Sequence, residues 1–165
     1  MKGYYPFKKV RANKYPDSYK ESKQVLKAMK KPDEEYFYLS DESPRTPFIK
    51  YLERENLEYD SDEIQKIIND SYPIIKAIKD YYNRPRPAQI NPAIKAYESK
   101  TAKTPAYPSG HSFQAFLIAK HLSKKYPLRT LTFYSIANRI SRARVSVGLH
   151  YPSDNEMSKK LAQML

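Results

Sequence analysis

Cysteine is absent from this sequence, which excludes thiolate nucleophiles, cysteine-ligated zinc and disulfide bonds. Tryptophan is absent too, and only 3 glycines occur beside 13 prolines and 16 tyrosines. No segment approaches the roughly twenty apolar residues that a membrane-spanning helix needs. The basic N-terminus, Met1 to Lys9, is not followed by an apolar run of signal-peptide length. These absences predict a soluble, unexported protein that is cytoplasmic by default.

The chain of 165 residues is long enough for one domain with a substantial core, and no repeat of a solenoid period is visible. We therefore expect a single domain over residues 1–165. The first 16 residues are rich in lysine and tyrosine, and Pro6 and Pro16 prevent a long helix there. Residues 1–16 are accordingly predicted to form an irregular basic arm.

The formal net charge of +12 is unevenly distributed along the chain. Residues 33–63 hold 11 acidic and 3 basic side chains, whereas residues 70–165 hold 16 basic and 5 acidic ones. We interpret the acidic block, residues 33–63, as a solvated helix face and loop. The basic C-terminal half predicts an anionic partner, with a phosphoester, an anionic membrane surface and a nucleic acid as the candidates.

Apolar residues recur every three or four positions and no alternating strand pattern occurs, which predicts an all-α fold. Residues 112–125 are apolar on nearly every side, so we expect them to form the central helix of a compact helical bundle. Pro73 is expected to kink or split the helix at residues 61–82. Ser153 is expected to cap the last helix. The other helices are expected from Asp17 or Ser18 to Met29, from Pro32, from Thr46, and from Leu128 to about Val147.

The loop predicted over residues 88–107 is long for a small domain, and loops of this kind are usually functional. It follows the run Arg84-Pro85-Arg86-Pro87, which ends the preceding helix because a residue before proline disfavours helical geometry. It leads into a Pro-Ser-Gly-His turn within Tyr107–Ser112, directly before the apolar helix. The loop therefore delivers polar residues to a helix start.

The first N–H groups of a helix have no partner within the helix, so this turn can hold an anion, with Ser109 and Gly110 contributing close donors. The alternative is an ordinary helix cap, in which Ser109 or Ser112 is the N-cap and His111 is an exposed first-turn residue. Taken alone, the turn favours the ordinary helix cap, because short motifs often match by chance.

Three cationic residues, Lys79, Arg86 and Arg144, border apolar stripes or helix ends. Buried cations are costly unless an anion meets them, which indicates a phosphate site. Structural alternatives exist for each: Lys79 extends to water, Arg86 is a solvated loop residue, and Arg144 pairs with a carboxylate of the acidic block. Taken alone, His150 and Asp154 are a lone histidine before a helix and an acidic first-turn residue.

Three groups of residues follow one another at fixed spacing: Lys79, six residues and Arg86-Pro87; Pro108-Ser109-Gly110-His111; and Arg144, five residues, His150, three residues and Asp154. Their order and spacing resemble the three-part signature of the superfamily of phosphatidic acid phosphatases, bacterial acid phosphatases and vanadium haloperoxidases. The resemblance covers residues 79–154. One departure is Ala143, where the family usually has serine, and the missing hydroxyl weakens a supporting hydrogen bond. Residues 1–60 carry no motif of the family.

The resemblance implies a role for each matching residue. His150 attacks phosphorus, Asp154 holds its other ring nitrogen, and His111 protonates the leaving oxygen and then activates water. Fixed cations replace a metal, so neither a metal nor a cofactor is expected, and vanadate is expected to inhibit as a phosphate mimic. The implied phosphate-binding residues are Lys79, Arg86, Ser109, Gly110 and Arg144.

The sequence thus predicts a metal-independent acid-phosphatase-like enzyme that hydrolyses phosphate monoesters, including lipid phosphates or diphosphates, through a phosphohistidine. One alternative is a vanadate-dependent haloperoxidase, which uses the same cradle but is much larger in this family. Another is a non-catalytic module that binds phosphates or polyanions. The expected partner is a small-molecule or lipid phosphoester, with peripheral contact to an anionic membrane surface and no nucleic acid.

Overall fold

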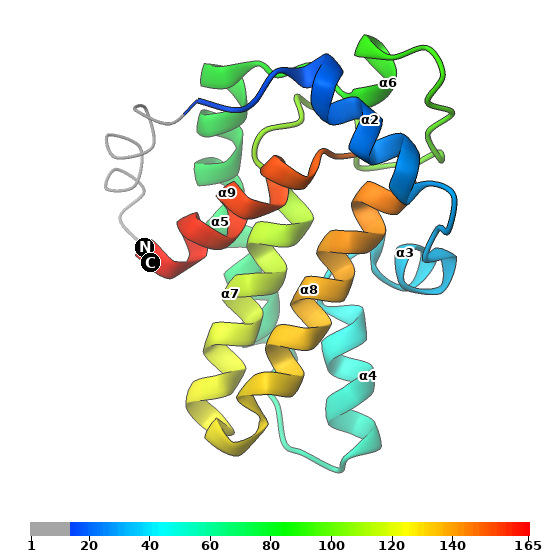
Figure 1. Cartoon of the computed structure of the whole chain (residues 1–165). Coiled ribbons are helices and arrows are strands. Elements are labelled where there is room, and N and C mark those ends of the chain that lie inside the picture. Colours follow the sequence, from blue (N-terminus) through cyan, green and yellow to red (C-terminus); the bar gives the residue numbers. More distant parts are fainter. Residues whose placement is uncertain (1–13) are drawn as a thin grey trace.

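The computed structural model describes residues 14–165, which form helices joined by loops, without a strand among these residues (Figure 1). The predicted all-α class is confirmed. Most of the predicted arm lies outside the described residues, and residues 14–16 are not helical. The elements are α2 (Ser18–Ala28), α3 (Glu34–Ser40), α4 (Thr46–Arg54), α5 (Ser61–Tyr82), α6 (Pro87–Ile90), α7 (Gly110–Lys125), the 3-10 turn η1 (Pro127–Arg129), α8 (Thr130–Ser146) and α9 (Pro152–Met164).

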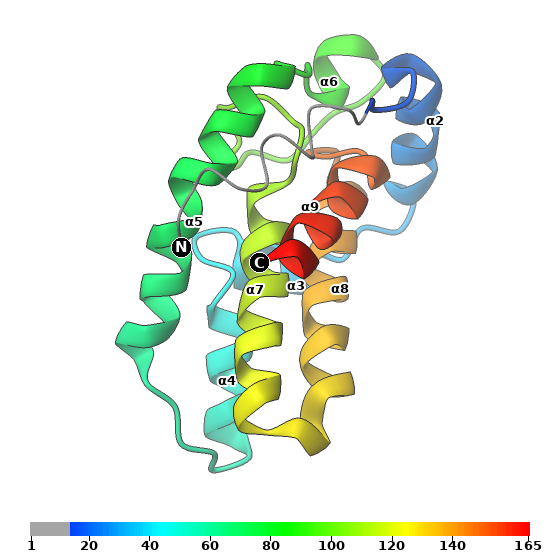
Figure 2. The same cartoon turned by 90° about the vertical axis from the view of Figure 1, so that its left-hand side faces the viewer.

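Helix α7 is the centre of the bundle. It packs against α5, α8 and α9, and Figure 2 shows α5 on one side of it and α8 on the other. Phe113, Ile118 and Leu122 are at most 2% exposed and form the core with apolar residues of the neighbouring helices. The central helix predicted over residues 112–125 is therefore present, and it begins two residues earlier, at Gly110.

Side-chain caps explain where several helices begin. Asp17 accepts a hydrogen bond from the Lys20 N–H at 2.9 Å before α2, and Ser109 accepts one from the Ser112 N–H at 3.3 Å before α7. The prediction that Ser153 caps the last helix is wrong. The N-cap of α9 is Tyr151, because Pro152 has no N–H to satisfy and fits the first helical position.

Helix α5 runs without interruption through Pro73, so the predicted split does not occur. Ile74, Ile75 and Ile78 follow Pro73 and are buried in the core, and Ile64 is buried before it. Proline removes one backbone hydrogen bond, but the apolar contacts on both sides hold the two halves of α5 to the same core. Because the helix continues, its last turn carries Lys79 to the same end of the bundle as the start of α7.

Two residues with left-handed backbone geometry turn the chain at this end. Asn83 has φ 46° and ends α5, and Gly148 has φ 83° and follows α8. A Cβ on Gly148 would lie 3.0 Å from side-chain atoms of Ile94 and Met29, so both the geometry and the space favour glycine. The turn after α8 places His150 beside the N-terminus of α9. Among the described residues, no helix is both long and apolar enough to cross a bilayer.

Candidate active site

A pocket of about 790 Å³ lies where the ends of α5, α7 and α8 meet the loop before α7. Six of the eight predicted site residues line it, which are Lys79, Arg86, Gly110, His111, Arg144 and His150. The other two, Ser109 and Asp154, are completely buried behind its wall. The structure therefore brings together residues from three separate sequence motifs.

The two cations of the first motif are anchored by backbone carbonyl groups of the loop before α7 and of the connector after α8. Arg86 donates from Nε to the Thr104 carbonyl at 2.8 Å and from Nη1 to the Leu149 carbonyl at 2.9 Å. Lys79 donates to the Pro105 carbonyl and is only 6% exposed, so it does not extend to bulk water. Both side chains are held in place before any ligand arrives.

Arg144 both pairs with a carboxylate of the acidic block and lines the pocket. Its Nη1 donates to Asp41 Oδ1 at 2.6 Å, which is the pairing with the acidic block that the alternative predicted. Its Nη2 lies 3.4 Å from Thr101 Oγ1, whereas its Nε is buried and has no hydrogen-bond partner among the described residues. An unpaired donor at a buried guanidinium that lines a pocket favours an anion as ligand.

His150 is held between a cation and a carboxylate. Its Nε2 lies 2.9 Å from Arg86 Nη1, and its Nδ1 lies 2.9 Å from Asp154 Oδ2. A guanidinium has no acceptor, so Nε2 must accept and carries the lone pair, while the proton is on Nδ1. Burial and the charges of Arg86 and Lys79 lower the pKa of His150 well below its usual value, so the imidazole is neutral at neutral pH.

Asp154 is completely buried at the start of α9. Its Oδ2 also accepts from the Tyr151 N–H at 2.9 Å, and its Oδ1 accepts from Arg84 Nη1 at 2.9 Å. Burial raises the pKa of Asp154 to about 7, and the charge of Arg84 and the Tyr151 N–H act in the opposite direction. The hydrogen bonds from Arg84 and from the Tyr151 N–H fix the orientation of the carboxyl group toward His150.

His111 contacts the acidic block through the backbone. Its Nε2 lies 2.8 Å from the Asp41 carbonyl oxygen, which can only accept, so Nε2 carries a proton and Nδ1 is the nitrogen that can take up a second one. Burial and the charge of Arg144 lower the pKa of His111 to about 3. His111 is thus neutral in the ligand-free pocket, and a bound anion would raise its pKa.

The Pro-Ser-Gly-His turn has the geometry of a helix cap and also reaches the pocket. Ser109 Oγ is the N-cap of α7, and the Ser109 N–H donates to the Asp154 carbonyl at 3.3 Å. Gly110 lines the pocket at the first turn of α7, the positive end of a helix of 16 residues. The helix terminus thus adds partial positive charge to the pocket.

Ala143, the departure from the family pattern, is completely buried in an apolar cluster with Phe37, Val147 and Leu149. The alanine side chain therefore packs among apolar neighbours at this position. Ala143 precedes Arg144 in the last turns of α8 and supports its backbone through these contacts.

Sequence reasoning missed three residues around the site. Asp41 is one of 11 acidic residues in the acidic block, and no spacing distinguishes it. Burial alone would raise the pKa of Asp41, but hydrogen bonds from Ser99 and Arg144 outweigh it and lower the pKa. Arg84 and Glu21, which pair with each other at 2.8 Å, were not singled out either. The one sequence signal for Arg84 is that it forms an Arg-Pro pair directly before the pair Arg86-Pro87.

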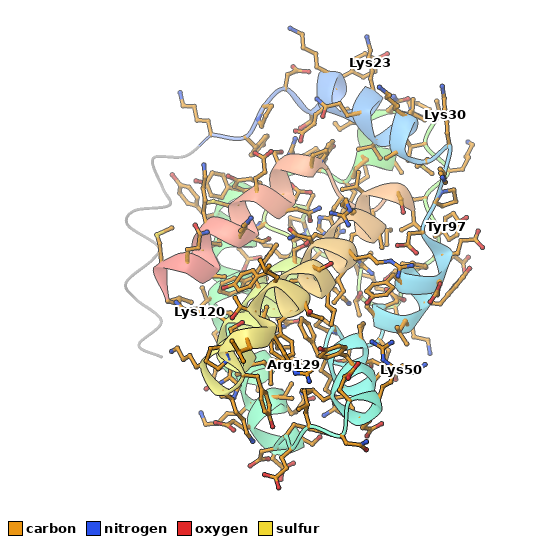
Figure 3. The ribbon with its side chains drawn as sticks, turned by 60° about the horizontal axis from the view of Figure 1, so that its bottom comes forward. Lys23, Lys30, Lys50, Tyr97, Lys120 and Arg129 are labelled. Carbon is orange, nitrogen blue, oxygen red and sulfur yellow. The ribbon has the colours of Figure 1, made fainter. Side chains whose placement is uncertain are left out.

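The basic side chains outside the pocket are not gathered on one face. Figure 3 shows Lys23 of α2 and Lys30, just after the end of α2, near the top of the view, whereas Lys50 lies lower down on α4, and all three are exposed. The buried cations Lys79 and Arg144 and the half-buried Arg86, in contrast, line the pocket together. This distribution favours a small anion in the pocket over a long polyanion along the surface.

Comparison with protein families finds that residues 68–162, more than half of the chain, match the model of the PAP2 superfamily. The matched segment contains every predicted site residue from Lys79 to Asp154. A search of the curated proteins finds no match to the chain. Within residues 14–165, no group of three or more His, Asp or Glu side chains is arranged to hold a metal ion.

Proposed function

The chain belongs to the PAP2 superfamily, a family of phosphatases and related enzymes, and from that membership we propose that it is a metal-independent phosphatase that acts on phosphate monoesters through a phosphohistidine. The observation that carries the proposal is the state of His150. Its Nε2 lone pair lies in a cationic pocket beside Arg86, and its Nδ1 proton is held by Asp154. This is the arrangement that a nitrogen nucleophile for phosphorus needs.

In the first step, Arg86 Nη1 transfers its hydrogen bond from Nε2 of His150 to a non-bridging oxygen of the bound ester. The freed Nε2 lone pair then forms a bond to phosphorus while the bond to the leaving oxygen breaks. The electron pair of that bond goes to the leaving oxygen, which takes a proton from His111. Arg86, Arg144 and Lys79 stabilise the charge on the non-bridging oxygens, and the unpaired Nε of Arg144 is free to donate. The products of this step are the alcohol and phosphorylated His150.

In the second step, water attacks phosphorus and gives a proton to His111, and the bond from phosphorus to Nε2 breaks. Its electron pair returns to His150, and inorganic phosphate leaves. The imidazole of His150 becomes positively charged in the first step and is neutral again after the second, and the carboxylate of Asp154 stabilises the charge of the intermediate through Nδ1. The two steps together consume one water molecule and return His111 and His150 to their starting protonation states.

The pocket has room for a leaving group as well as a phosphate. Ile68, Tyr72 and Ile75 of α5 line one wall, and Lys100 and Lys103 belong to the loop before α7. These surroundings suit an organic leaving group with both apolar and anionic parts, as sugar phosphates, nucleotides and lipid phosphates have. The pocket does not select among these classes, so a substrate screen is the informative experiment.

We expect phosphate release from monoesters to continue in an excess of chelator and to be inhibited by vanadate. Lys79, Arg86 and Arg144 provide the positive charge that a metal ion would otherwise supply. The measurement is phosphate release from monoesters, diphosphates and phosphatidic acid, each with and without EDTA. Strict dependence on added Mg²⁺ or Zn²⁺ would refute the proposed chemistry.

We expect the affinity for inorganic phosphate to fall as the pH rises above 7. Burial and the charge of Arg86 lower the pKa of Lys79 to about 7, so Lys79 loses its proton above that pH in the free protein. A bound anion favours the ammonium form and raises that pKa, so binding above pH 7 takes up a proton. One linked proton weakens binding by roughly tenfold per pH unit.

The variant Lys79→Arg separates this effect from the ionisation of phosphate itself. A guanidinium stays charged between pH 7 and 9, so the variant should lose the part of the pH dependence that Lys79 contributes. The measurement is calorimetric titration of both proteins with inorganic phosphate over that range. Identical pH profiles of the two proteins would show that Lys79 does not titrate with phosphate binding.

A further inference from the structure

Arg84 is one of the most deeply buried charged residues of the structure, with no exposed surface. Its guanidinium stacks between the rings of Tyr151 and Tyr15, at 3.7 and 4.4 Å from the ring centroids. Its nitrogens donate to Ser18 Oγ at 3.2 Å, to Ser153 Oγ at 2.7 Å and to two carboxylates. A guanidinium cannot be neutralised by losing its proton, so these partners must offset the cost of burial.

The two carboxylates come from opposite ends of the chain. Arg84 Nη2 donates to Glu21 Oε2 at 2.8 Å, and Arg84 Nη1 donates to Asp154 Oδ1 at 2.9 Å. Glu21 belongs to α2 and is 4% exposed, whereas Asp154 belongs to α9. Helix α2 lies outside the residues matched by the family model, 68–162. A residue from outside the matched segment thus reaches His150 through two intermediate residues, Arg84 and Asp154.

Glu21 fixes the other end of this arrangement. It accepts from the Ser153 N–H with Oε1 and from the Ser153 hydroxyl with Oε2, both at 2.7 Å. Ser153 is the neighbour of Asp154 in the first turn of α9, so Glu21 holds the backbone that carries Asp154. Both oxygens of Glu21 and the whole fork of Arg84 are therefore used at this one place.

We propose that Glu21 and Arg84 form a buried positioning pair that fixes Asp154, and through it the tautomer of His150, which makes α2 part of the catalytic apparatus. The inference rests on the proposed function. With Oδ1 occupied by Arg84, Asp154 presents only Oδ2 to the Nδ1 proton of His150. The proton stays on Nδ1, and the lone pair stays on Nε2 in the pocket.

The charges of the pair explain why it contains an acid as well as a base. Arg84 alone would neutralise Asp154, and His150 would lose the negative charge that stabilises its imidazolium. Glu21 restores one negative charge to the group of Glu21, Arg84 and Asp154. The group can then stabilise the positive charge that forms on His150 when phosphorus is bound. Glu21 and Arg84 touch neither substrate nor the reacting nitrogen.

The test compares Arg84→Met with Arg139→Met. Arg139 makes a similar link, because it pairs with Asp33 Oδ2 at 2.8 Å and stacks on Tyr36, but it lies outside the site. Nitrogen NMR of the imidazoles reports the tautomer of His150 without requiring turnover, and steady-state kinetics reports kcat and KM separately. The tautomer is therefore tested even if the protein hydrolyses none of the esters tried.

For Arg84→Met we expect the His150 signals to lose the pattern of a single Nδ1–H tautomer. We also expect kcat to fall by about 10–100-fold, the usual effect of removing a partner that orients a functional ligand, with KM unchanged within twofold. Arg139→Met should keep the wild-type tautomer and kcat. If Arg84→Met keeps the Nδ1–H tautomer and the kcat of Arg139→Met, the pair is only structural and the inference is wrong.

If Arg84→Met does not fold, Glu21→Gln tests the role of the Glu21–Arg84 pair. Glutamine keeps the shape but replaces one of the two accepting oxygens by an NH2 group and removes the negative charge. Arg84 still holds Asp154 Oδ1, so the Nδ1–H tautomer should remain while phosphorylation of His150 slows by about tenfold. Lack of any turnover in the wild-type protein, together with a wild-type Nδ1–H tautomer that Arg84→Met loses, would overturn the proposed function and leave the positioning role supported. A phosphorylation rate of Glu21→Gln equal to wild type would overturn the charge argument.

Discussion

We expect replacement of His150 by alanine to abolish phosphate release from every ester, because it removes the nitrogen that is proposed to form the bond to phosphorus. Loss of a catalytic nucleophile lowers kcat by on the order of 10⁶-fold, which leaves no measurable phosphoenzyme. His150 is 2% exposed, and alanine in its place also removes the contacts of Nδ1 with Asp154 and of Nε2 with Arg86. The measurement is steady-state phosphate release together with the circular dichroism of the variant.

His121→Ala is the matched control for this prediction. His121 is a helical histidine near Glu63, at 3.5 Å, and it lies outside the pocket. Its replacement should leave kcat unchanged within twofold. Folded His150→Ala with more than about 1% of wild-type turnover would contradict the assigned role, since no other group of the site is proposed to attack phosphorus.

We expect replacement of His111 by alanine to have an effect that depends on the leaving group. An alkyl phosphate needs a proton on its leaving oxygen, so phosphorylation by it should slow by about 10²–10⁴-fold, the scale of general acid catalysis. A nitrophenyl phosphate releases a stable anion and needs that proton little, so its phosphorylation step should slow much less. The difference between the two esters isolates proton donation from any general damage to the pocket.

The measurement is single-turnover phosphorylation of wild type and His111→Ala by both esters. Burial lowers the pKa of His111 to about 3 in the free pocket. His111 must therefore take up its proton when the anionic substrate binds. Asp41→Asn tests this uptake, because that variant weakens the charge that favours protonated His111. Equal losses for the two esters would show that His111 does not protonate the leaving oxygen.

The helices and the membership of the pocket follow from local signals in the sequence. Periodic apolar residues place α5, α7 and α8, and a short turn with glycine places Ser109 and His111 at a helix start. The residues of each motif lie close together in the sequence, at the end of one helix or in one connector between helices. Motif spacing therefore predicted six side chains that line one pocket and two, Ser109 and Asp154, that lie buried beside them, whereas the catalytic roles of all eight stay predictions.

The partners of these side chains were not predictable in the same way. Asp41 and Glu21 lie 103 and 63 residues away from the arginines with which they pair, Arg144 and Arg84. Such pairs depend on how the helices pack. The local sequence around one acidic residue in a charged stretch does not indicate which distant arginine it will contact. The misplaced cap at Ser153 has a related cause, because its hydroxyl is used by Glu21 and not by the start of α9.

The central claim is that phosphorus is transferred to His150, and the most direct test is to trap that intermediate. The protein is mixed with a nitrophenyl phosphate in a single turnover, quenched in alkali, in which phosphohistidine survives, and the phosphorylated peptide is located by mass spectrometry. The account predicts an acid-labile phosphoryl group on Nε2 of His150, formed at the rate at which nitrophenolate appears and absent from His150→Ala. A phosphoryl group on another residue, or nitrophenolate release with no phosphorylated protein at any time point, would contradict it.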